Sequence, residues 1–96
     1  MSIIVNISIV AKPGLEQELA RGIAAAQKLA RVESQNHGAS VLRNVDDARQ
    51  LIIHEVWDTR EAYETFKSRV VKTPEVSHLF AMIEGEPRYS YFETID

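Results

Sequence analysis

The chain contains no cysteine, which excludes disulfide bonds, thiolate chemistry and cysteine-ligated metal sites. Its basic residues are scattered and its net charge is -3, so it lacks the basic patch or stripe of a nucleic-acid-binding surface. The first apolar run breaks at Asn6, far short of a membrane span, and no basic segment of a signal peptide precedes it. These absences favour a cytoplasmic protein that binds neither nucleic acid nor membrane.

Several common catalytic signatures are also missing. The three histidines show no i,i+4 spacing and no carboxylate cluster, so no metal site is predicted. Gly-rich phosphate loops, Walker motifs and nucleophile elbows are absent from the sequence. What remains is an ordinary globular composition, 45% hydrophobic and 26% charged over 96 residues. This length predicts a single domain, residues 1–96, with one core.

The hydrophobic pattern changes period several times along the chain. Runs rich in β-branched or alternating apolar residues predict four strands, at residues 3–10, 39–45, 51–57 and 88–95. Apolar residues at three- or four-residue spacing predict a helix over 15–36 and another from 59 to about 72. Thr73 and Pro74 then predict the start of a short helix that ends before Gly85.

This order, β-α-β-β-α-β, predicts an α+β fold of the ferredoxin-like type: a four-stranded antiparallel sheet with its helices on one face. The other face would then be bare. Because apolar residues occur on both faces of the first and third predicted strands, something must cover it. A second copy of the chain, packed sheet against sheet, is the simplest cover, and we expect a homodimer.

The most informative stretch runs from Glu55 to Tyr63 and holds the only tryptophan, Trp57. Alternation along a strand puts Glu55 and Trp57 on one face. Asp58 and Glu61 then have the spacing of a capping box that opens the next helix. A carboxylate beside a large aromatic ring at a strand end is a position where a small pocket could be lined.

These motifs together resemble one known family. They are Lys12-Pro13-Gly14, Gly38, Glu55-x-Trp57-x-Thr59-x-Glu61-Ala62 and Thr73-Pro74. The set resembles the antibiotic biosynthesis monooxygenase (ABM) domain across nearly the whole chain. The resemblance implies the dimeric α+β barrel, in which two ferredoxin-like protomers pack their sheets together. It also implies an oxygenase without a cofactor that acts on a small aromatic, quinol or polyketide-type substrate.

The same resemblance suggests the catalytic residues. Trp57 occupies the family's usual tryptophan position, where it would form a pocket wall, and Asn6 matches a strand asparagine that would polarise a substrate oxygen. Many members carry histidines where this chain has Phe66 and Glu75. His78 is therefore our candidate for the base that replaces them. The predicted substrate-binding residues are Ser8, Glu55, Tyr63 and Phe66.

Each candidate also has a structural interpretation. Trp57 could belong to the core or the dimer interface, and the Asn6 amide could be satisfied by backbone or water. For Glu55 an ion pair with Arg43 or Arg88 is the expectation that we favour over a role as base. Tyr89 and Tyr91, on the last predicted strand, could seal the dimer, which is the expectation that we favour, or donate phenolic hydrogen bonds.

Two other functions stay open at this point. The first is a non-catalytic dimeric module of the same fold that binds small molecules or serves a stress response. The second is haem degradation, because the same domain also occurs in haem-degrading enzymes. The missing histidines after Trp57 weigh most against the haem hypothesis.

Overall fold

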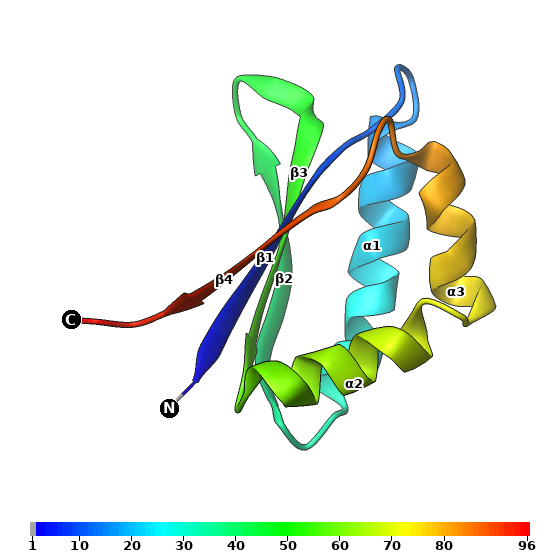
Figure 1. The fold of residues 1–96 in the computed structure, drawn as a ribbon. Coiled ribbons are helices and arrows are strands. Elements are labelled where there is room, and N and C mark those ends of the chain that lie inside the picture. The colour runs from blue at the N-terminus through cyan, green and yellow to red at the C-terminus, as the bar shows by residue number, and fades with distance from the viewer. Residues whose placement is uncertain (1) are drawn as a thin grey trace.

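A computed structural model describes residues 2–96 of the chain. Figure 1 shows a single sheet with all of its helices on one side. In chain order the elements are β1 (Ile3–Val10), α1 (Glu16–Arg31), β2 (Asn36–Asn44), β3 (Asp47–Trp57), α2 (Arg60–Val70), α3 (Pro74–Ser77), the 3-10 helix η1 (His78–Met82) and β4 (Arg88–Glu93).

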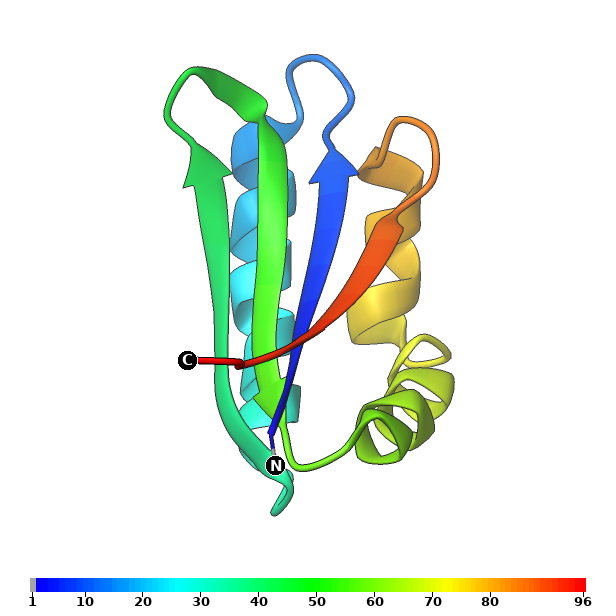
Figure 2. The ribbon, with the colours of Figure 1, turned by 60° about the vertical axis from the view of Figure 1, so that its left-hand side comes forward.

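The strands lie in the order β2-β3-β1-β4, and every neighbouring pair is antiparallel. Figure 2 shows α1 crossing behind β2, β3 and β1, with α2, α3 and η1 completing the same layer beside β4. This is the ferredoxin-like α+β arrangement, and the predicted fold class is confirmed. The second predicted helix is divided at Thr73, as the Thr73-Pro74 pair indicated.

Two predicted element boundaries shift by several residues. α1 ends at Arg31 rather than near residue 36, because the chain joins the sheet earlier: the Asp58 N–H donates to the carbonyl of Gln35. β3 begins at Asp47 rather than at residue 51. Asn44 pairs with Asp47, so the hairpin turns over two residues, Val45 and Asp46.

The predicted cap of α2 was wrong by one residue. The cap is Thr59, whose hydroxyl accepts a hydrogen bond from the N–H of Ala62 at 3.0 Å. The Asp58 carboxylate is instead paired with the ring of His37. That pair connects the start of β2 to the end of β3 and thereby fixes the position at which α2 begins.

The core lies between the helices and one face of the sheet, which we call the helix face. Odd-numbered side chains of β1 point into it, and Val5 and Ile9 are almost fully buried. α1 contributes the stripe predicted from its spacing, with Leu19 and Ile23 buried against the strands. Trp57, at the end of β3, is 1% exposed.

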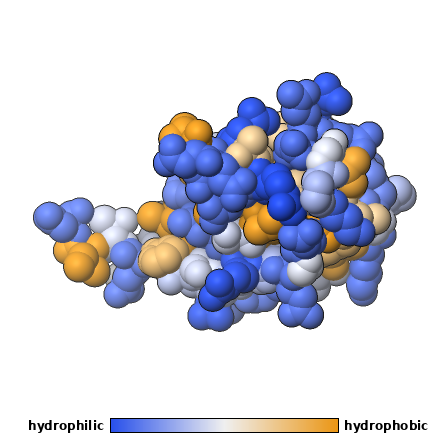
Figure 3. Space-filling model, turned by 90° about the horizontal axis from the view of Figure 1, so that it is seen from above, coloured by the Kyte–Doolittle hydropathy of each residue, from blue (hydrophilic) through white to orange (hydrophobic). Residues whose placement is uncertain are grey.

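The opposite face of the sheet, which we call the open face, includes two apolar cross-strand pairs, Ile4 with Phe92 and Ile52 with Leu42. Within residues 2–96 no helix covers it, and Leu42 and Phe92 are each 50% exposed. Figure 3 shows the C-terminal segment extending from the body of the molecule as a narrow tail that carries apolar surface.

None of the helices described over residues 2–96 is long and apolar enough to cross a membrane.

The packing of α1 on the sheet can be tested by truncating its most buried side chain. Leu19→Ala should lower the free energy of unfolding by about 2–5 kcal/mol, because it leaves a cavity under a side chain that is 0% exposed. Val32→Ala, beyond the same helix and 79% exposed, should change it by less than about 0.5 kcal/mol. Urea unfolding of both variants measures the difference. Equal effects would contradict this placement of α1.

Candidate functional site

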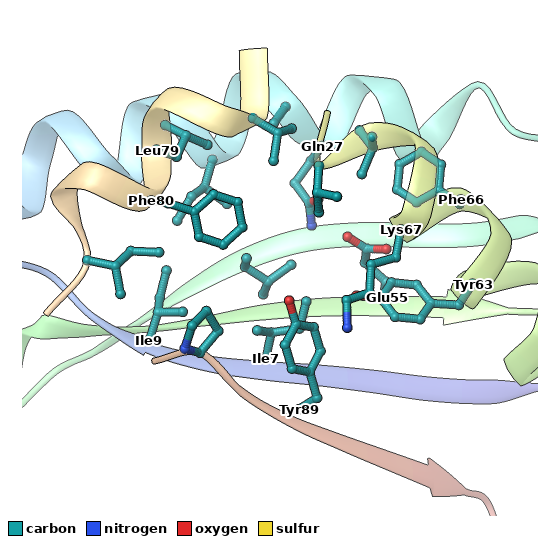
Figure 4. A pocket seen from close by; sticks show the side chains of 18 residues that line it. Ile7, Ile9, Gln27, Glu55, Tyr63, Phe66, Lys67, Leu79, Phe80 and Tyr89 are labelled. Carbon is teal, nitrogen blue, oxygen red and sulfur yellow. The ribbon is translucent and has the colours of Figure 1, made fainter. Parts of the chain in front are cut away.

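A cavity of about 100 Å³ lies between the helix face of the sheet and the helices. Figure 4 shows its walls: strands below, α1 behind, α2 at one end and η1 at the other. Most of its lining is apolar, with Ile7 and Ile9 from β1 and Leu79 and Phe80 from η1. The side chains with polar groups are Gln27, Glu55, Tyr63, Lys67 and Tyr89. An apolar space with a few converging polar groups is the usual form of a small-molecule site.

Glu55 is the acidic group of the cavity and is only 4% exposed. One carboxylate oxygen accepts a hydrogen bond from the indole N–H of Trp57 at 2.8 Å. Burial raises the pKa of Glu55, while hydrogen bonds from Trp57 and Gln27 act in the opposite direction without cancelling it. The Glu55 carboxylate is therefore a stronger base than an exposed glutamate.

The expected ion pair of Glu55 with an arginine does not form. Among residues 2–96 no ion pair includes Glu55. Arg43 lies opposite Leu51, four residues along β3 from Glu55, and Arg88 lies opposite Ser8 on the open face. Arg43 is therefore too far along the strand to pair with Glu55, and Arg88 lies on the opposite side of the sheet from it.

Trp57 lies behind Glu55 and does not line the cavity. Its ring packs edge-on against Tyr63, with centroids 6.0 Å apart, and at a tilt against Phe66, with centroids 5.0 Å apart. The structural interpretation of this tryptophan as a core residue therefore holds. It acts on the cavity through the hydrogen bond to Glu55 and through its packing against the wall residues Tyr63 and Phe66.

α2 supplies the wall next to Glu55. Tyr63, Phe66 and Lys67 all line the cavity, because residues three and four positions apart share one face of a helix. Tyr89 faces them from β4, where it pairs with Ile7 of the helix face. Its expected place at the dimer surface was wrong for that reason. Burial raises the pKa of both Tyr63 and Tyr89, so their hydroxyls stay protonated and can donate hydrogen bonds.

Asn6 and Ser8 do not join this group. They alternate with Val5 and Ile7 on β1 and so point to the open face. There the Asn6 Oδ1 lies 2.7 Å from the Nδ1 of His54, and Ser8 accepts a hydrogen bond from Gln50 at 3.3 Å. The prediction of one pocket shared by Asn6 and Trp57 is corrected here, because the sheet separates them.

His78 is also outside the cavity. It begins η1 with an exposed side chain, and its Nδ1 lies 2.7 Å from the carbonyl oxygen of Pro74. Its neighbours Leu79 and Phe80 do line the cavity. None of the three histidines is a wall residue, so Glu55 is the only lining carboxylate or imidazole that can exchange a proton.

η1 approaches α1 closely where it closes the cavity. A Cβ atom added to Gly22 would lie 2.5 Å from the terminal carbon Cδ2 of Leu79, so the absence of a side chain at Gly22 permits this contact. Next to Leu79, Phe80 lies partly in solvent, 43% exposed. At the cavity, η1 therefore presents Leu79, which packs against α1, and Phe80, which is partly exposed to solvent.

Sequence reasoning missed Gln27 and Lys67. Gln27 is 4% exposed on the apolar stripe of α1 between Ile23 and Ala30, and its amide donates to the Ser40 carbonyl at 3.0 Å. The available signal for Gln27 was a polar residue at a helix position where the spacing predicts an apolar one. Lys67 follows Phe66 in the sequence, and nothing in the helical pattern marked it as a wall residue.

No group of three or more histidine, aspartate or glutamate side chains that could hold a metal ion occurs in the described part of the chain.

Comparison with known proteins gives a consistent family and fold. The family model described as "Antibiotic biosynthesis monooxygenase" matches residues 2–81. A search of curated proteins finds no significant match. Among solved structures, a protein of Bordetella bronchiseptica assigned to these monooxygenases has a TM-score of 0.79 at 16% identity, with 98% of this chain and 97% of that chain covered.

A Pseudomonas aeruginosa protein is similar at a TM-score of 0.79 and 17% identity, covering 99% of this chain and 95% of that one. One from Nitrosomonas europaea, again assigned to the monooxygenases, gives 0.80 at 10% identity, covering 98% and 90%. At such identities the similarity establishes the fold.

The burial of Glu55 predicts a dependence of stability on pH. Its pKa is higher in the folded than in the unfolded chain, so its ionisation destabilises the fold as the pH rises through the folded-state pKa. Glu55→Gln removes that ionisation and keeps an acceptor for Trp57. The variant should therefore gain stability relative to wild type between about pH 5 and about pH 8. Urea unfolding at both pH values measures this; a difference that does not change with pH would contradict the prediction.

Proposed function

Because the chain belongs to the antibiotic biosynthesis monooxygenase family, we propose that it is a monooxygenase that needs no cofactor and acts on a small aromatic, quinol or polyketide-type compound. The observation that supports this most is the buried Glu55 carboxyl at the wall of an apolar cavity, with a raised pKa. A base of that kind can remove a weakly acidic proton from a bound ring. The assignment of this role to Glu55, rather than to His78, follows from their positions.

The reaction would begin when the Glu55 carboxylate takes the proton of a phenolic hydroxyl on the bound ring. The resulting anion transfers one electron to dioxygen, and the two radicals combine to form a carbon–oxygen bond. The peroxide then loses its carbon-bound proton as the oxygen–oxygen bond breaks, which leaves a carbonyl and releases hydroxide. Glu55 returns its proton to that hydroxide as water. The sum is one ring C–H, one phenolic O–H and one O₂ converted to two C=O groups and one H₂O.

Cavity size limits the substrate. About 100 Å³ is close to the space that holds a single benzene-sized ring. A larger polycyclic compound would fit only if the partly exposed side chain of Phe80 moved out of the cavity wall. A single-ring quinol or phenol fits the cavity as it stands and is the substrate class that we propose.

Trp57 would act as a positioning residue in this reaction. Its N–H fixes one Glu55 oxygen at 2.8 Å and so holds the carboxyl at the cavity wall. Without the indole N–H of Trp57, the ionised Glu55 carboxyl loses a hydrogen bond that stabilises it. Trp57→Phe should consequently raise the pKa of Glu55 further and move the pH profile of the enzyme with it.

We also propose that the open face packs against a second copy of the chain, as the sequence predicted. Support comes from its exposed apolar side chains, Leu42 and Phe92, and from the partly buried Ile4 and Ile52 between them. In such a dimer the pair of Asn6 and His54 would lie at the interface. This gives Asn6 a role in assembly instead of the catalytic role predicted for it.

A non-catalytic binding module remains the second candidate, and the small volume of the cavity is the observation in its favour. Haem degradation ranks third, because a haem in this cavity would find no histidine on the walls as an axial ligand. The cytoplasmic location inferred from the sequence stays a prediction.

The enzymatic proposal predicts oxygen consumption with single-ring quinols. Glu55→Gln should lower kcat/KM by about 10²–10⁴-fold, because the base is lost. Glu18→Gln, on the exposed side of α1, should leave it unchanged. In wild type, kcat/KM should rise with pH through a pKa above that of an ordinary glutamate, since only the ionised carboxyl acts. An oxygen electrode measures all of these rates.

Two results would count against an enzyme. Oxygen uptake that does not exceed the buffer rate across the quinol panel would reject catalysis; ligand binding without uptake would then favour the binding module. Uptake that persists in Glu55→Gln would show that Glu55 is not the base.

The dimer has its own test. Light scattering should give twice the chain mass of 10.9 kDa. Leu42→Glu should convert the protein to a folded monomer, because it places a charge in the apolar interface. Val45→Glu, at the hairpin tip and 96% exposed, should remain dimeric. A wild-type mass of a single chain would reject the proposal.

A further inference from the structure

The polar groups of the cavity gather at one end. Glu55, Tyr63 and Lys67 converge beside Tyr89, whereas Ile9, Leu79 and Phe80 occupy the other end (Figure 4). A ligand that matches this division would carry its polar group toward α2 and its apolar body toward η1. The charge of that polar group is set by the residues at the α2 end.

Lys67 is the only cationic side chain on the wall. It lies one helical turn beyond Tyr63, and its Nζ stands 3.7 Å from the centroid of the Tyr89 ring. This contact holds the ammonium over the aromatic face instead of letting it extend into solvent. The ring thereby fixes a positive charge at the cavity.

No carboxylate neutralises this charge in the part of the chain that the structure describes. The ion pairs found there involve His37, Arg49, Arg60 and Arg69, and Lys67 is in none of them. Glu55 lines the same cavity, yet its hydrogen bond goes to Trp57. Lys67 is partly buried and belongs to none of these ion pairs, so its ammonium is available to an anionic group in the cavity, with which it would form a charge-assisted hydrogen bond.

The neighbouring hydroxyls favour the same kind of ligand. Tyr63 and Tyr89 keep their protons at neutral pH and so can donate to a negatively charged oxygen. Gln27 also lines the cavity, but its amide already donates to the Ser40 carbonyl and to Glu55. Two hydroxyl donors beside one cation form a site for an anionic oxygen rather than for a cation.

We propose that Lys67 makes this cavity selective for small ring compounds that carry an anionic oxygen, a carboxylate or a phenolate. The anionic oxygen pairs with the ammonium of Lys67, and the ring lies against Leu79 and Phe80. This inference deepens the proposed function because it specifies the substrate class of the same cavity. It requires binding alone, so it can be tested without turnover.

Benzoate and benzamide are matched probes, since they share shape and ring and differ in charge. Isothermal calorimetry at neutral pH should show benzoate binding to wild type about tenfold more tightly than benzamide. Lys67→Met should abolish the preference, because it keeps the length of the side chain without its charge. The fluorescence of Trp57, the only tryptophan, provides a second readout beside Glu55.

Two further variants complete the test. Lys67→Arg should keep the preference for benzoate, because it restores a cation at the same place. Lys72→Met, on an exposed residue beyond the end of α2, should keep it as well and controls for the loss of one positive charge. Circular dichroism establishes that each variant is folded.

Three results would overturn the proposal: equal binding of the two probes to wild type, an unchanged preference in Lys67→Met, or no binding of either probe. None of them depends on oxygen uptake. A protein that selects benzoate through Lys67 yet consumes no oxygen would support this inference while rejecting the monooxygenase.

Discussion

The hydrogen bond from the Trp57 indole to the Glu55 carboxyl is the interaction on which the rest of the site depends. It joins two side chains two residues apart on one strand, both almost fully buried. A buried carboxylate without a donor would be strongly destabilising, so this N–H allows an ionisable group to remain beneath α2. The same ring packs against Tyr63 and Phe66 and thereby sets the position of the helix that forms the cavity wall. Core packing and the chemistry of the cavity thus share one residue.

The cavity combines a rigid side with a more adaptable one. β1 is paired with β3 along its whole length, and the pairing holds Ile7, Ile9 and Glu55 in fixed register. The opposite wall consists of α2 and the short α3–η1 segment, in which Leu79 is buried against Gly22 while Phe80 is partly in solvent. Sites of this construction keep the reacting group still and let the entrance adjust to the ligand. Lys67 belongs to the helical wall, and its ammonium lies over the ring of Tyr89 in the sheet.

The order of elements and the fold class followed from hydrophobic period and turn residues, since those signals are local. Boundaries were less accurate where a side chain decided them: Thr59 rather than Asp58 caps α2, and the tight turn between Asn44 and Asp47 lengthens β3. For the site, Glu55, Tyr63 and Phe66 were found as wall residues. The grouping of Asn6 with Trp57 failed because it depended on the register between β1 and β3, which places Asn6 opposite His54 and Trp57 opposite Ile3.

Alternation along a strand meant that the sequence alone placed Glu55 and Trp57 on one face, and the motifs around them indicated the family. It also showed that both faces of the sheet carry apolar residues, from which the expectation of a partner arises. Only the tertiary structure decided what Glu55 meets there. Gln27 of α1, Lys67 of α2 and Tyr89 of β4 line the same cavity as Glu55, although all three are far from it in the chain. The burial that raises the pKa of Glu55 comes from these packed layers, and local sequence does not encode it.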